Sequence, residues 1–555
     1  MNITLKINGI EHIIDAPAST TLLAALRGLG FHGVKFGDEH GLSGADTVLL
    51  DGKPVNAGSM LAAQAEGHAV ATIEALGEHP EQGWRKTDGL HPLQKAFVEL
   101  GAIQCGYCTP AQILAAKSLL ENNSNPTEAE VREAISGVLC RCTGYLKPVQ
   151  AVLKAAAEMR GEGEQWTMDS DQYSVFGEPP ASGGASGDSP MLATQLKPKV
   201  IVVPETEKWQ TVGKPEKKVD AIKLVQGKPA FTADMDMRGM LYAKVLHSPH
   251  AHAKITRIDA TKALALKGVV SVLTWKDIPR VVYSTAGQSD PIPGPLDSFS
   301  LDNKVRFVGD RVAFVAAETP EIAEKALALI EVDYEILPAV LDSRESMKPG
   351  AIKLHDEPEY VNFADSNPDK NLAAEIRIDI GDVNKGFAEA DEIFEAEYEV
   401  PKVQQAHIEP HVCVTYWDED DRLVIRTSTQ VPFHVRRMLA PVLDLPVKRI
   451  RVIKPRIGGG FGGKQEVLME DVAAHLTIAT RRPVIYEYTR EEEFIAARSR
   501  HPMRVKMNTG VKKDGTITAN EMYALSDTGA YGCHALTVTG NTGHKAMALY
   551  VGDGE

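Results

Sequence analysis

The sequence predicts a multidomain α+β protein, and three features carry that prediction. Residues 1–78 alternate short strand-like runs with one apolar helical stretch, whereas residues 90–160 show helical periodicity. A segment rich in Gly, Pro and Ser, residues 161–205, predicts a linker, and strand-like and helical runs are interspersed beyond it. At 555 residues several domains are expected.

The first segment predicts a small mixed α/β domain. Strands are expected at residues 3–7, 12–14, 47–50 and 69–74, and a helix around 21–26. Asp51 and Gly52 lie between two of these strands and predict a hairpin turn, because both residue types tolerate a positive φ.

The second segment predicts a helical domain. Helices are expected at residues 91–97, 112–120, 128–138 and 149–159. Thr127 followed by Glu130 is typical of a capping box, in which each side chain accepts from the other residue's backbone N–H.

Four of the six cysteines form a C-x2-C and a C-x-C pair at the ends of these helices. They are Cys105, Cys108, Cys140 and Cys142. Four thiolates at this spacing can close around a soft metal, and an iron–sulfur cluster is the first interpretation. A four-thiolate zinc knuckle is the alternative, although C-x-C is a tighter spacing than zinc sites usually show. The other cysteines, Cys413 and Cys533, are isolated, which excludes a dense disulfide framework and indicates a reducing compartment.

Composition narrows the class of protein further. A net charge of −15 with 24% charged residues disfavours a nucleic-acid partner. Residues 1–7 alternate polar and apolar as a strand does, unlike a signal peptide, and no apolar run reaches membrane-spanning length. We therefore expect a cytoplasmic protein without a membrane or nucleic-acid partner.

The remainder of the chain predicts mixed α and β structure. Strands are expected at residues 240–245, 269–273, 311–316, 328–334, 412–417 and 423–427, and helices at 320–329 and 467–480. The glycine-rich run 458–463 lets backbone N–H groups converge on a bulky anionic ligand. With Lys464 it nearly matches a P-loop, but Gln465 stands where Mg²⁺ binding needs a hydroxyl, so ATP is disfavoured.

Seven motifs together resemble the xanthine dehydrogenase/aldehyde oxidoreductase family of molybdenum hydroxylases over essentially the whole chain. In order they are Gln104–Pro110 (QCGYCTP), Cys140–Tyr145 (CRCTGY), Phe231–Met235 (FTADM), Ser248–His252 (SPHAH), Val308–Asp310 (VGD), Gln430–Pro432 (QVP) and Gly458–Lys464 (GGGFGGK). The resemblance implies hydroxylation of a purine-like N-heterocycle such as xanthine or hypoxanthine, or oxidation of an aldehyde. A molybdenum-pterin cofactor would do the chemistry, and electrons would leave through a [2Fe-2S] cluster.

The resemblance also implies roles for individual residues. The four paired cysteines would hold the cluster nearest molybdenum, and Gln104 would touch the pterin. Gln430 would hydrogen-bond an oxygen ligand on molybdenum, and Phe461 would approach the metal, so these two are the catalytic candidates. The cofactor-binding candidates in the glycine-rich run are Gly459, Gly460, Phe461 and Gly462.

Two further patterns bear on substrate and metal. The xanthine-type branch has an acid after the loop lysine, whereas this chain has Gln465 and then Glu466; we still place a purine ahead of an aldehyde. His407, Glu409 and His411 would share one face of a strand and so invite a metal-site interpretation. The family's motif here is structural, so we interpret them as structural and Cys413 as a small core residue.

The resemblance divides the chain into domains. Residues 1–78 would form a β-grasp ferredoxin-like domain, 85–160 a four-helix [2Fe-2S] domain, 206–345 an a/b hammerhead domain and 346–555 the N-terminal part of a molybdenum-cofactor-binding domain. The usual cluster-ligand positions of the first domain hold Asp38, Ser43, Asp46 and Gly58. We therefore expect that domain to lack a cluster and the chain to carry one.

The chain departs from the family pattern in two other ways, and both concern its partners. The short linker leaves no room for a flavin domain, so FAD, if used, is expected on a separate subunit. Family members continue for several hundred residues, which supply the Glu base, so we expect that base outside this chain and a complementing C-terminal polypeptide. A homodimer is compatible with the sequence. The alternative function is a catalytically incomplete electron-transfer or assembly subunit.

Overall fold

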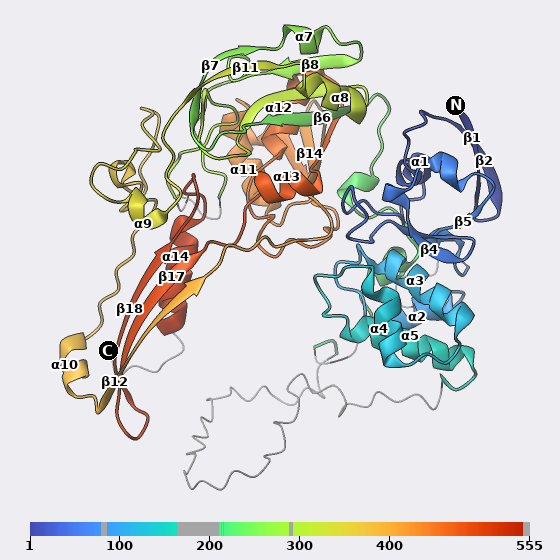
Figure 1. The fold of residues 1–555 in the computed structure, drawn as a ribbon, viewed down its shortest axis with the longest axis horizontal. Helices are drawn as coiled ribbons and strands as arrows, with labels where there is room; N and C mark the ends of the chain where they lie inside the picture. The colour runs from blue at the N-terminus through green and yellow to red at the C-terminus, as the bar shows by residue number, and fades with distance from the viewer. Residues whose placement is uncertain are drawn as a thin grey trace. The chain divides into compact units, whose positions relative to one another are not determined.

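A computed structural model describes residues 1–78, 86–163, 210–212, 214, 216–287, 292 and 294–547, with side chains described to 543. The chain forms two compact units. Unit 1 comprises Met1–Phe36 and His40–Lys228, and unit 2 comprises Gly37–Glu39 and Pro229–Glu555. Residues 1–163 of unit 1 are blue to cyan, its residues after the grey gap are green, and unit 2 is mostly green to red in Figure 1. The predicted linker lies outside the described residues from position 164 to its end.

Unit 1 begins with a five-stranded sheet of β-grasp topology, as predicted. The strands are β1 (Asn2–Ile7), β2 (Ile10–Asp15), β3 (Thr47–Leu50), β4 (Lys53–Asn56) and β5 (Ala69–Ala71), in the order β2-β1-β5-β3-β4. Helix α1 (Leu22–Gly28) packs its apolar side chains into the same core as Leu5 and Val48. The expected hairpin forms with φ of 49° at Asp51 and 79° at Gly52. β5 ends earlier than predicted because a 3₁₀ turn, η3 (Ile73–Ala75), follows it.

Four helices complete unit 1, which confirms the predicted four-helix domain. They are α2 (Pro92–Glu99), α3 (Thr109–Asn122), α4 (Glu128–Ser136) and α5 (Leu146–Met159). The capping box forms at the start of α4, where Glu130 N donates to Thr127 Oγ1 and Thr127 N donates to Glu130 Oε2. The short elements η1 (Ala57–Ser59), η2 (Ala62–Ala65) and α6 (Ala221–Val225) also belong to this unit.

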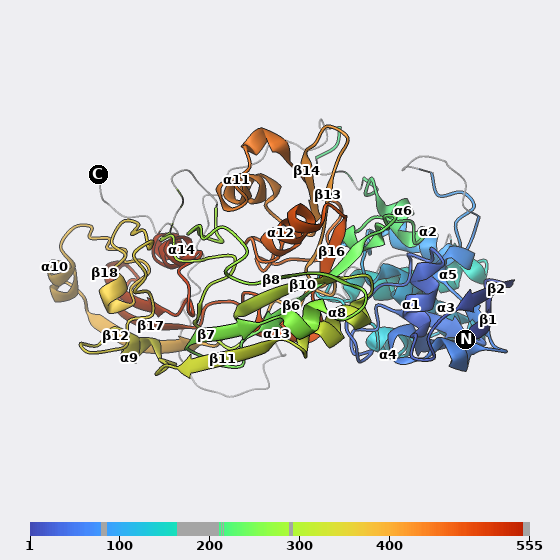
Figure 2. The same ribbon diagram turned by 90° about the horizontal axis from the view of Figure 1, so that it is seen from above.

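Unit 2 is built on a seven-stranded mixed sheet in the order β15-β14-β13-β16-β6-β10-β8. The strands are β6 (Leu241–His247), β8 (Val269–Leu273), β10 (Arg311–Ala317), β13 (Val412–Trp417), β14 (Leu423–Thr427), β15 (Ile450–Ile453) and β16 (Val484–Glu487). Helix α12 (Glu470–Thr480) packs on β13 and β16 (Figure 2). Because β16 pairs with both β6 and β13, segments far apart in sequence share one core.

Two three-stranded sheets flank this core. One contains β7 (Ala253–Asp259), β9 (Lys304–Val305) and β11 (Glu331–Ile336), and the other contains β12 (Glu392–Val400), β17 (Met503–Val511) and β18 (Ile517–Ser526). Helix α14 (Ala535–Met547) packs beside β18 (Figures 1 and 2). The other elements are α7 (Thr261–Leu264), α8 (Pro320–Leu327), α9 (Ser343–Ser346), α10 (Val383–Ala388), α11 (Pro432–Val442), α13 (Arg490–Ile495), η6 (Thr232–Asp234), η7 (Pro368–Lys370) and η8 (Val447–Arg449).

Two predicted boundaries in unit 2 are wrong, each for a local reason. β11 begins at Glu331 and not at 328, because the N–H groups of Leu329 and Ile330 still bond back to α8. Helix α12 begins at Glu470 and not at 467, because the Glu470 carboxylate accepts from Leu468 N and Met469 N just before the helix. The predicted domain boundaries near 205 and 345 stay predictions.

We expect Gly44→Ala to destabilise unit 1 more than Gly52→Ala. Both glycines have positive φ, 65° and 79°, which costs about 1–2 kcal/mol for an alanine. A Cβ at Gly52 has nothing within 4 Å, whereas one at Gly44 would overlap the carbonyl oxygen of Gly137, just before the Cys140 turn. Urea unfolding of the two variants, followed by circular dichroism, checks this; equal midpoints would contradict it.

Candidate functional site

The structure brings the four paired cysteines together in unit 1. Cys105 and Cys108 lie on the turn that enters α3, and Cys140 and Cys142 lie on the turn that follows α4. Hydrogen bonds join Cys142 to Cys105 and Cys108 to Cys140 across the two turns, and a third joins Cys140 to Cys142 within the second turn. Cys108 is buried and the other three are partly buried.

Local backbone geometry holds both cysteine turns. Gly106, inside the C-x2-C turn, has a φ of 85°, and a side chain there would collide with Leu224. In the C-x-C turn, Thr143 Oγ1 lies 3.1 Å from the Cys140 sulfur, and Cys140 N donates to the Tyr145 hydroxyl at 2.8 Å. Hydrogen bonds to ligand sulfurs are one means by which a protein tunes the potential of a cluster.

Neighbouring thiols shift the pKa values of three of the four cysteines. Hydrogen bonds from Cys108 and then Cys142 lower the pKa of the Cys140 thiol to about 2. The hydrogen bond to Cys140, with burial, raises the pKa of Cys108, and the bond to Cys105 raises that of Cys142. Four sulfurs gathered at one site fit a group with two irons, each of which needs two thiolates.

The N-terminal sheet domain holds polar groups where a second cluster would need thiolates. Residues 1–78 contain no cysteine. Asp46 is buried, and its Oδ2 accepts from Gly58 N at 2.5 Å, while the carbonyl of the buried Ser43 accepts from Leu139 N. A carboxylate that accepts a backbone hydrogen bond occupies this position, and the loss of a cluster from this domain stays a prediction.

In unit 2, Gln430 contacts the glycine-rich loop through both its backbone and its side chain. Its Oε1 accepts from Gly462 N at 3.0 Å and from Lys464 N at 3.3 Å, and its backbone N donates to Lys464 O at 2.8 Å. Two N–H groups of the loop thus converge on one oxygen atom, and their convergence on a bulky anionic ligand stays a prediction. Here that oxygen belongs to an amide side chain.

The loop glycines are required for three different reasons. A Cβ at Gly460 would lie 2.5 Å from Gln430 Oε1, and one at Gly459 would lie 2.8 Å from the Phe461 ring. Gly462 has nothing within 4 Å of its Cβ position but a φ of 94°. Phe461 has a φ of 52° and is 48% exposed, a strained conformation of the kind that clusters at ligand sites. The open side of the loop thus lies at Phe461 and Gly462, which fits a large ligand there.

A buried ion pair contacts both ends of the glycine-rich loop on its inner side. Lys464 and Glu409 are both completely buried, with Nζ 2.8 Å from Glu409 Oε2. The same Oε2 accepts from Gly458 N at 2.6 Å, so one carboxylate oxygen binds both ends of the loop. Lys464 Nζ also donates to the carbonyls of Glu409 and Pro410. Because Lys464 is committed to these partners, it does not serve as a phosphate-binding lysine.

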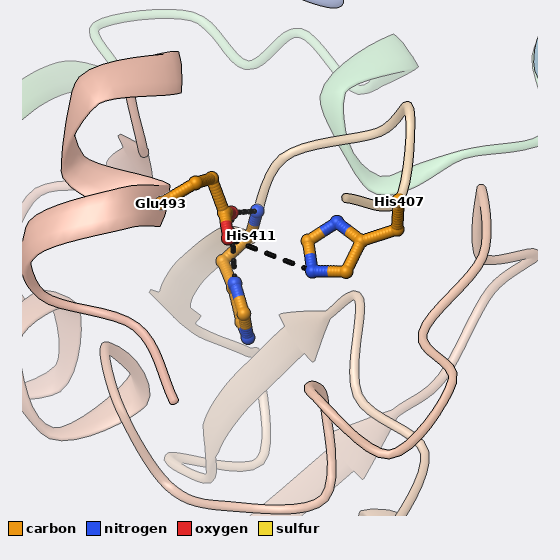
Figure 3. Close-up of side chains that lie close together, drawn as sticks. All are labelled: His407, His411 and Glu493. Carbon is orange, nitrogen blue, oxygen red and sulfur yellow. Dashed lines mark hydrogen bonds and ion pairs between the residues drawn. The ribbon is translucent and has the colours of Figure 1, made fainter. Parts of the chain in front are cut away.

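The prediction that His407, Glu409 and His411 share a strand face is wrong. β13 begins at Val412, and Ala406 has a φ of 51°, so the segment before it is irregular. Glu409 pairs with Lys464, whereas the two histidines meet Glu493 of α13 (Figure 3). Sequence reasoning missed Glu493, because no local motif connects it to residues more than 80 positions earlier.

A second buried cluster lies just after the loop. Glu466 accepts from Thr285 Oγ1 at 2.7 Å and from Arg498 Nε at 2.8 Å, and its Oε1 lies 2.9 Å from His534 Nδ1. Burial opposes ionisation, but the Arg498 charge and these hydrogen bonds hold the pKa of Glu466 well below its usual range. Glu466 is thus a paired internal carboxylate, and the neighbouring Gln465 is partly exposed.

The remaining predicted site residue, Gln104, is an exposed residue directly before Cys105 in unit 1. Its contact with a pterin stays a prediction. The structure brings together Gln430 with the loop residues Gly460 and Gly462, and the four cysteines with one another. Cys413 is a fully buried core residue of β13, as predicted.

Three family models match the chain in order. The [2Fe-2S] binding domain matches residues 72–153, the aldehyde oxidase and xanthine dehydrogenase a/b hammerhead domain matches 226–338, and the molybdopterin cofactor-binding domain matches 363–553. The first contains the four cysteines, and the third contains Gln430 and the glycine-rich loop.

Similar proteins and structures agree with these models. The probable hypoxanthine oxidase XdhD of Escherichia coli O157:H7 is 38% identical over 99% of this chain and 56% of that protein. The nicotinate dehydrogenase large molybdopterin subunit of Eubacterium barkeri is 33% identical over 62% of this chain and 76% of that subunit. The structure of aldehyde oxidoreductase from Desulfovibrio gigas matches with a TM-score of 0.76 and 29% identity, over 95% of this chain and 54% of that one.

The fold and the two sites define a chain with a [2Fe-2S] binding domain and a molybdopterin cofactor-binding domain. More particularly, the chain belongs to the xanthine dehydrogenase/aldehyde oxidoreductase family of molybdenum hydroxylases. It spans a little over half the length of the oxidase and of the aldehyde oxidoreductase. In the described part of the chain, no helix is both long enough and apolar enough to cross a membrane.

We expect Cys142→Ser to abolish iron binding and Cys413→Ala to retain it. Removal of one thiol leaves a site that cannot supply two thiolates to each of two irons, so iron should fall from about two atoms per chain to near zero. Cys413 lies in the core of unit 2 and supplies the matched loss of a buried cysteine. Iron quantitation on anaerobically purified protein checks this, and retention of iron by Cys142→Ser would contradict it.

We expect Glu409→Gln to destabilise unit 2 by about 3–5 kcal/mol, because it leaves the buried Lys464 ammonium uncompensated. The double variant Glu409→Leu, Lys464→Met removes both charges and should recover much of that stability, while Gly458 N still loses its acceptor. Denaturant unfolding of both variants measures this. A single variant as stable as the unmodified chain would contradict the role given to the pair.

Proposed function

We propose that this chain is the iron–sulfur and molybdenum-cofactor part of a hydroxylase acting on a purine-like N-heterocycle. The observation that carries the proposal is the combination, in one chain, of a four-thiol site and a glycine loop whose N–H groups converge on the Gln430 oxygen. An electron-transfer or assembly subunit would have use for the first site and none for the second.

The chain's own residues would hold the cofactors as follows. Cys105, Cys108, Cys140 and Cys142 would hold one [2Fe-2S] cluster. The molybdenum-pterin group, when bound, supplies the two-electron redox chemistry, and the cluster carries electrons away singly. Gly459, Gly460, Phe461 and Gly462 would line the cofactor on the open side of the loop, and Gln104 would touch the pterin from the cysteine turn.

Gln430 has a defined orientation for this task. Its Oε1 is engaged by two loop N–H groups, so its Nε2 is the part of the amide that can donate to an oxygen at the cofactor. Such donors, fixed before reaction, stabilise charge that develops at a reacting centre. The ring of Phe461, whose backbone is strained, would shield the donor group of Gln430 from water.

A purine is favoured over an aldehyde for two reasons. The 38% identical relative is named a probable hypoxanthine oxidase. Gln465 follows the loop and carries both a donor and an acceptor, which suits the edge of a heterocycle. Aldehyde oxidation is the competing activity, because the aldehyde oxidoreductase has the same fold.

We further propose that turnover needs other polypeptides. Two relatives are named as molybdenum-binding or molybdopterin subunits, which supports assembly with separate chains. FAD, if used, would arrive on such a subunit. The four free thiols are suited to a reducing compartment such as the cytoplasm.

The test is elemental analysis for iron, molybdenum and zinc on the chain, made anaerobically in a host that synthesises the pterin cofactor. We expect about two irons with near-stoichiometric molybdenum. An assembled enzyme that contains this chain should oxidise hypoxanthine faster than benzaldehyde. The variant Gln430→Leu should keep iron and lose about 100-fold or more in turnover. Iron without molybdenum would favour the electron-transfer role, and zinc in the cysteine site would overturn the cluster assignment.

A further inference from the structure

Three buried side chains behind the glycine loop are not used by the proposed reaction. His407, His411 and Glu493 are 1%, 4% and 0% exposed, and one potential ligand atom from each lies within 4.8 Å of the others. Figure 3 shows both imidazole rings beside the Glu493 carboxylate, which comes from α13. All three belong to unit 2.

Hydrogen bonds fix which ring nitrogen of each histidine carries a proton. His407 Nδ1 lies 2.6 Å from the carbonyl oxygen of Glu409, and His411 Nε2 lies 3.2 Å from that of Gly463. A carbonyl oxygen can only accept, so each of these nitrogens is the N–H donor. In a neutral ring the other nitrogen, Nε2 of His407 and Nδ1 of His411, then presents a lone pair.

Both lone pairs face the same carboxylate. His407 Nε2 lies 3.5 Å from Glu493 Oε2, and His411 Nδ1 lies 2.8 Å from Glu493 Oε1. Oε2 is buried and has no hydrogen-bond partner in the described part of the chain. Acceptors that face one another in a buried site cost free energy unless a cation lies between them.

The neighbouring charges do not supply that cation. Lys464 donates to Glu409 and to two carbonyl oxygens, so its three protons are committed elsewhere. The ion pairs of Glu493 among the described residues are those with His407 and His411.

We propose that His407 Nε2, His411 Nδ1 and the Glu493 carboxylate bind one divalent transition-metal ion of the zinc class. Two imidazoles and one carboxylate are a zinc ligand set. In such sites the second ring N–H of each ligating histidine donates to a carbonyl or carboxylate, as both do here. The bond from His411 to Gly463 connects the ion to the glycine loop, so the ion fixes the loop from behind.

The experiment uses the full chain with its cysteine site already filled by the iron–sulfur cluster. The protein is treated with a chelator, returned to Zn²⁺, and examined by elemental analysis and zinc-edge X-ray absorption. We expect one zinc per chain, with nitrogen and oxygen ligands at about 2.0–2.2 Å and no sulfur at about 2.3 Å. A sulfur shell would mean that zinc occupies the cysteine site.

Matched variants test the ligands. Glu493→Gln and His407→Gln should weaken zinc binding by about 100-fold or more, since each removes one of three protein ligands. Glu492→Gln is the control: Glu492 is the next residue of α13, is also buried and also bonds a histidine, His247, at 3.1 Å, yet lies outside the cluster. It should keep the unmodified affinity.

Three results would overturn the proposal. One is folded, cluster-loaded chain that takes up no zinc, which would mean that protons occupy the space between the rings and the carboxylate. Another is zinc with sulfur ligands alone, and the third is unmodified affinity in folded Glu493→Gln. If that variant does not fold, the absorption spectrum of the unmodified chain still decides. None of these results depends on turnover, so they test the zinc site independently of the proposed function.

Discussion

The arrangement of unit 2 depends on the need to compensate buried charges. Lys464 and Glu409 have no exposed surface, and their ion pair joins the segment before β13 to both ends of the glycine loop. A buried charge without a partner costs several kcal/mol, so the chain cannot adopt alternatives that separate the two. Arg311 with Asp471 and Arg306 with Glu357 do the same elsewhere in this unit, and each joins segments at least 50 residues apart. Such pairs add little net stability, but they exclude other arrangements of the backbone.

In unit 1 the geometry of the cysteine site depends on contacts between residues close in sequence. The cysteine turns are held by neighbours in sequence: Gly106 supplies a left-handed conformation, Thr143 contacts the Cys140 sulfur, and the hydroxyl of Tyr145 accepts from Cys140 N. The capping box of α4 fixes the start of the helix that leads to the second turn. A site made of short-range contacts can form as soon as its helices pack, whereas the glycine loop of unit 2 depends on partners far along the chain.

This difference explains how much the sequence could predict. The helices of unit 1, the capping box and the common site of the four cysteines follow from patterns of a few residues, and the structure shows each of them. The glycine loop was also visible, because glycine spacing is local. The residues that contact the loop and its neighbours could not be predicted in the same way. Glu409 was assigned to a strand face, and no motif connects Glu493 to the histidines or Arg498 to Glu466. Their partners are chosen by the sheet order, in which β16 lies between β6 and β13. The spacing of residues within one segment does not reveal the order of the strands in a sheet.

The glycine loop shows why its resemblance to a phosphate loop is misleading. In a phosphate loop the glycines allow the backbone to surround an anion and the lysine reaches the same ligand. Here a Cβ at Gly460 would collide with the Gln430 oxygen, and a Cβ at Gly459 would collide with the Phe461 ring. Lys464 points away into the core toward Glu409. Only Gly462 has open space beside it, and its φ of 94° alone requires glycine. The loop is therefore complementary to an amide side chain on its inner side and open on its outer side. That asymmetry suits a loop that orients Gln430 toward a large cofactor, since the amide oxygen is already engaged and the amide nitrogen is left to act.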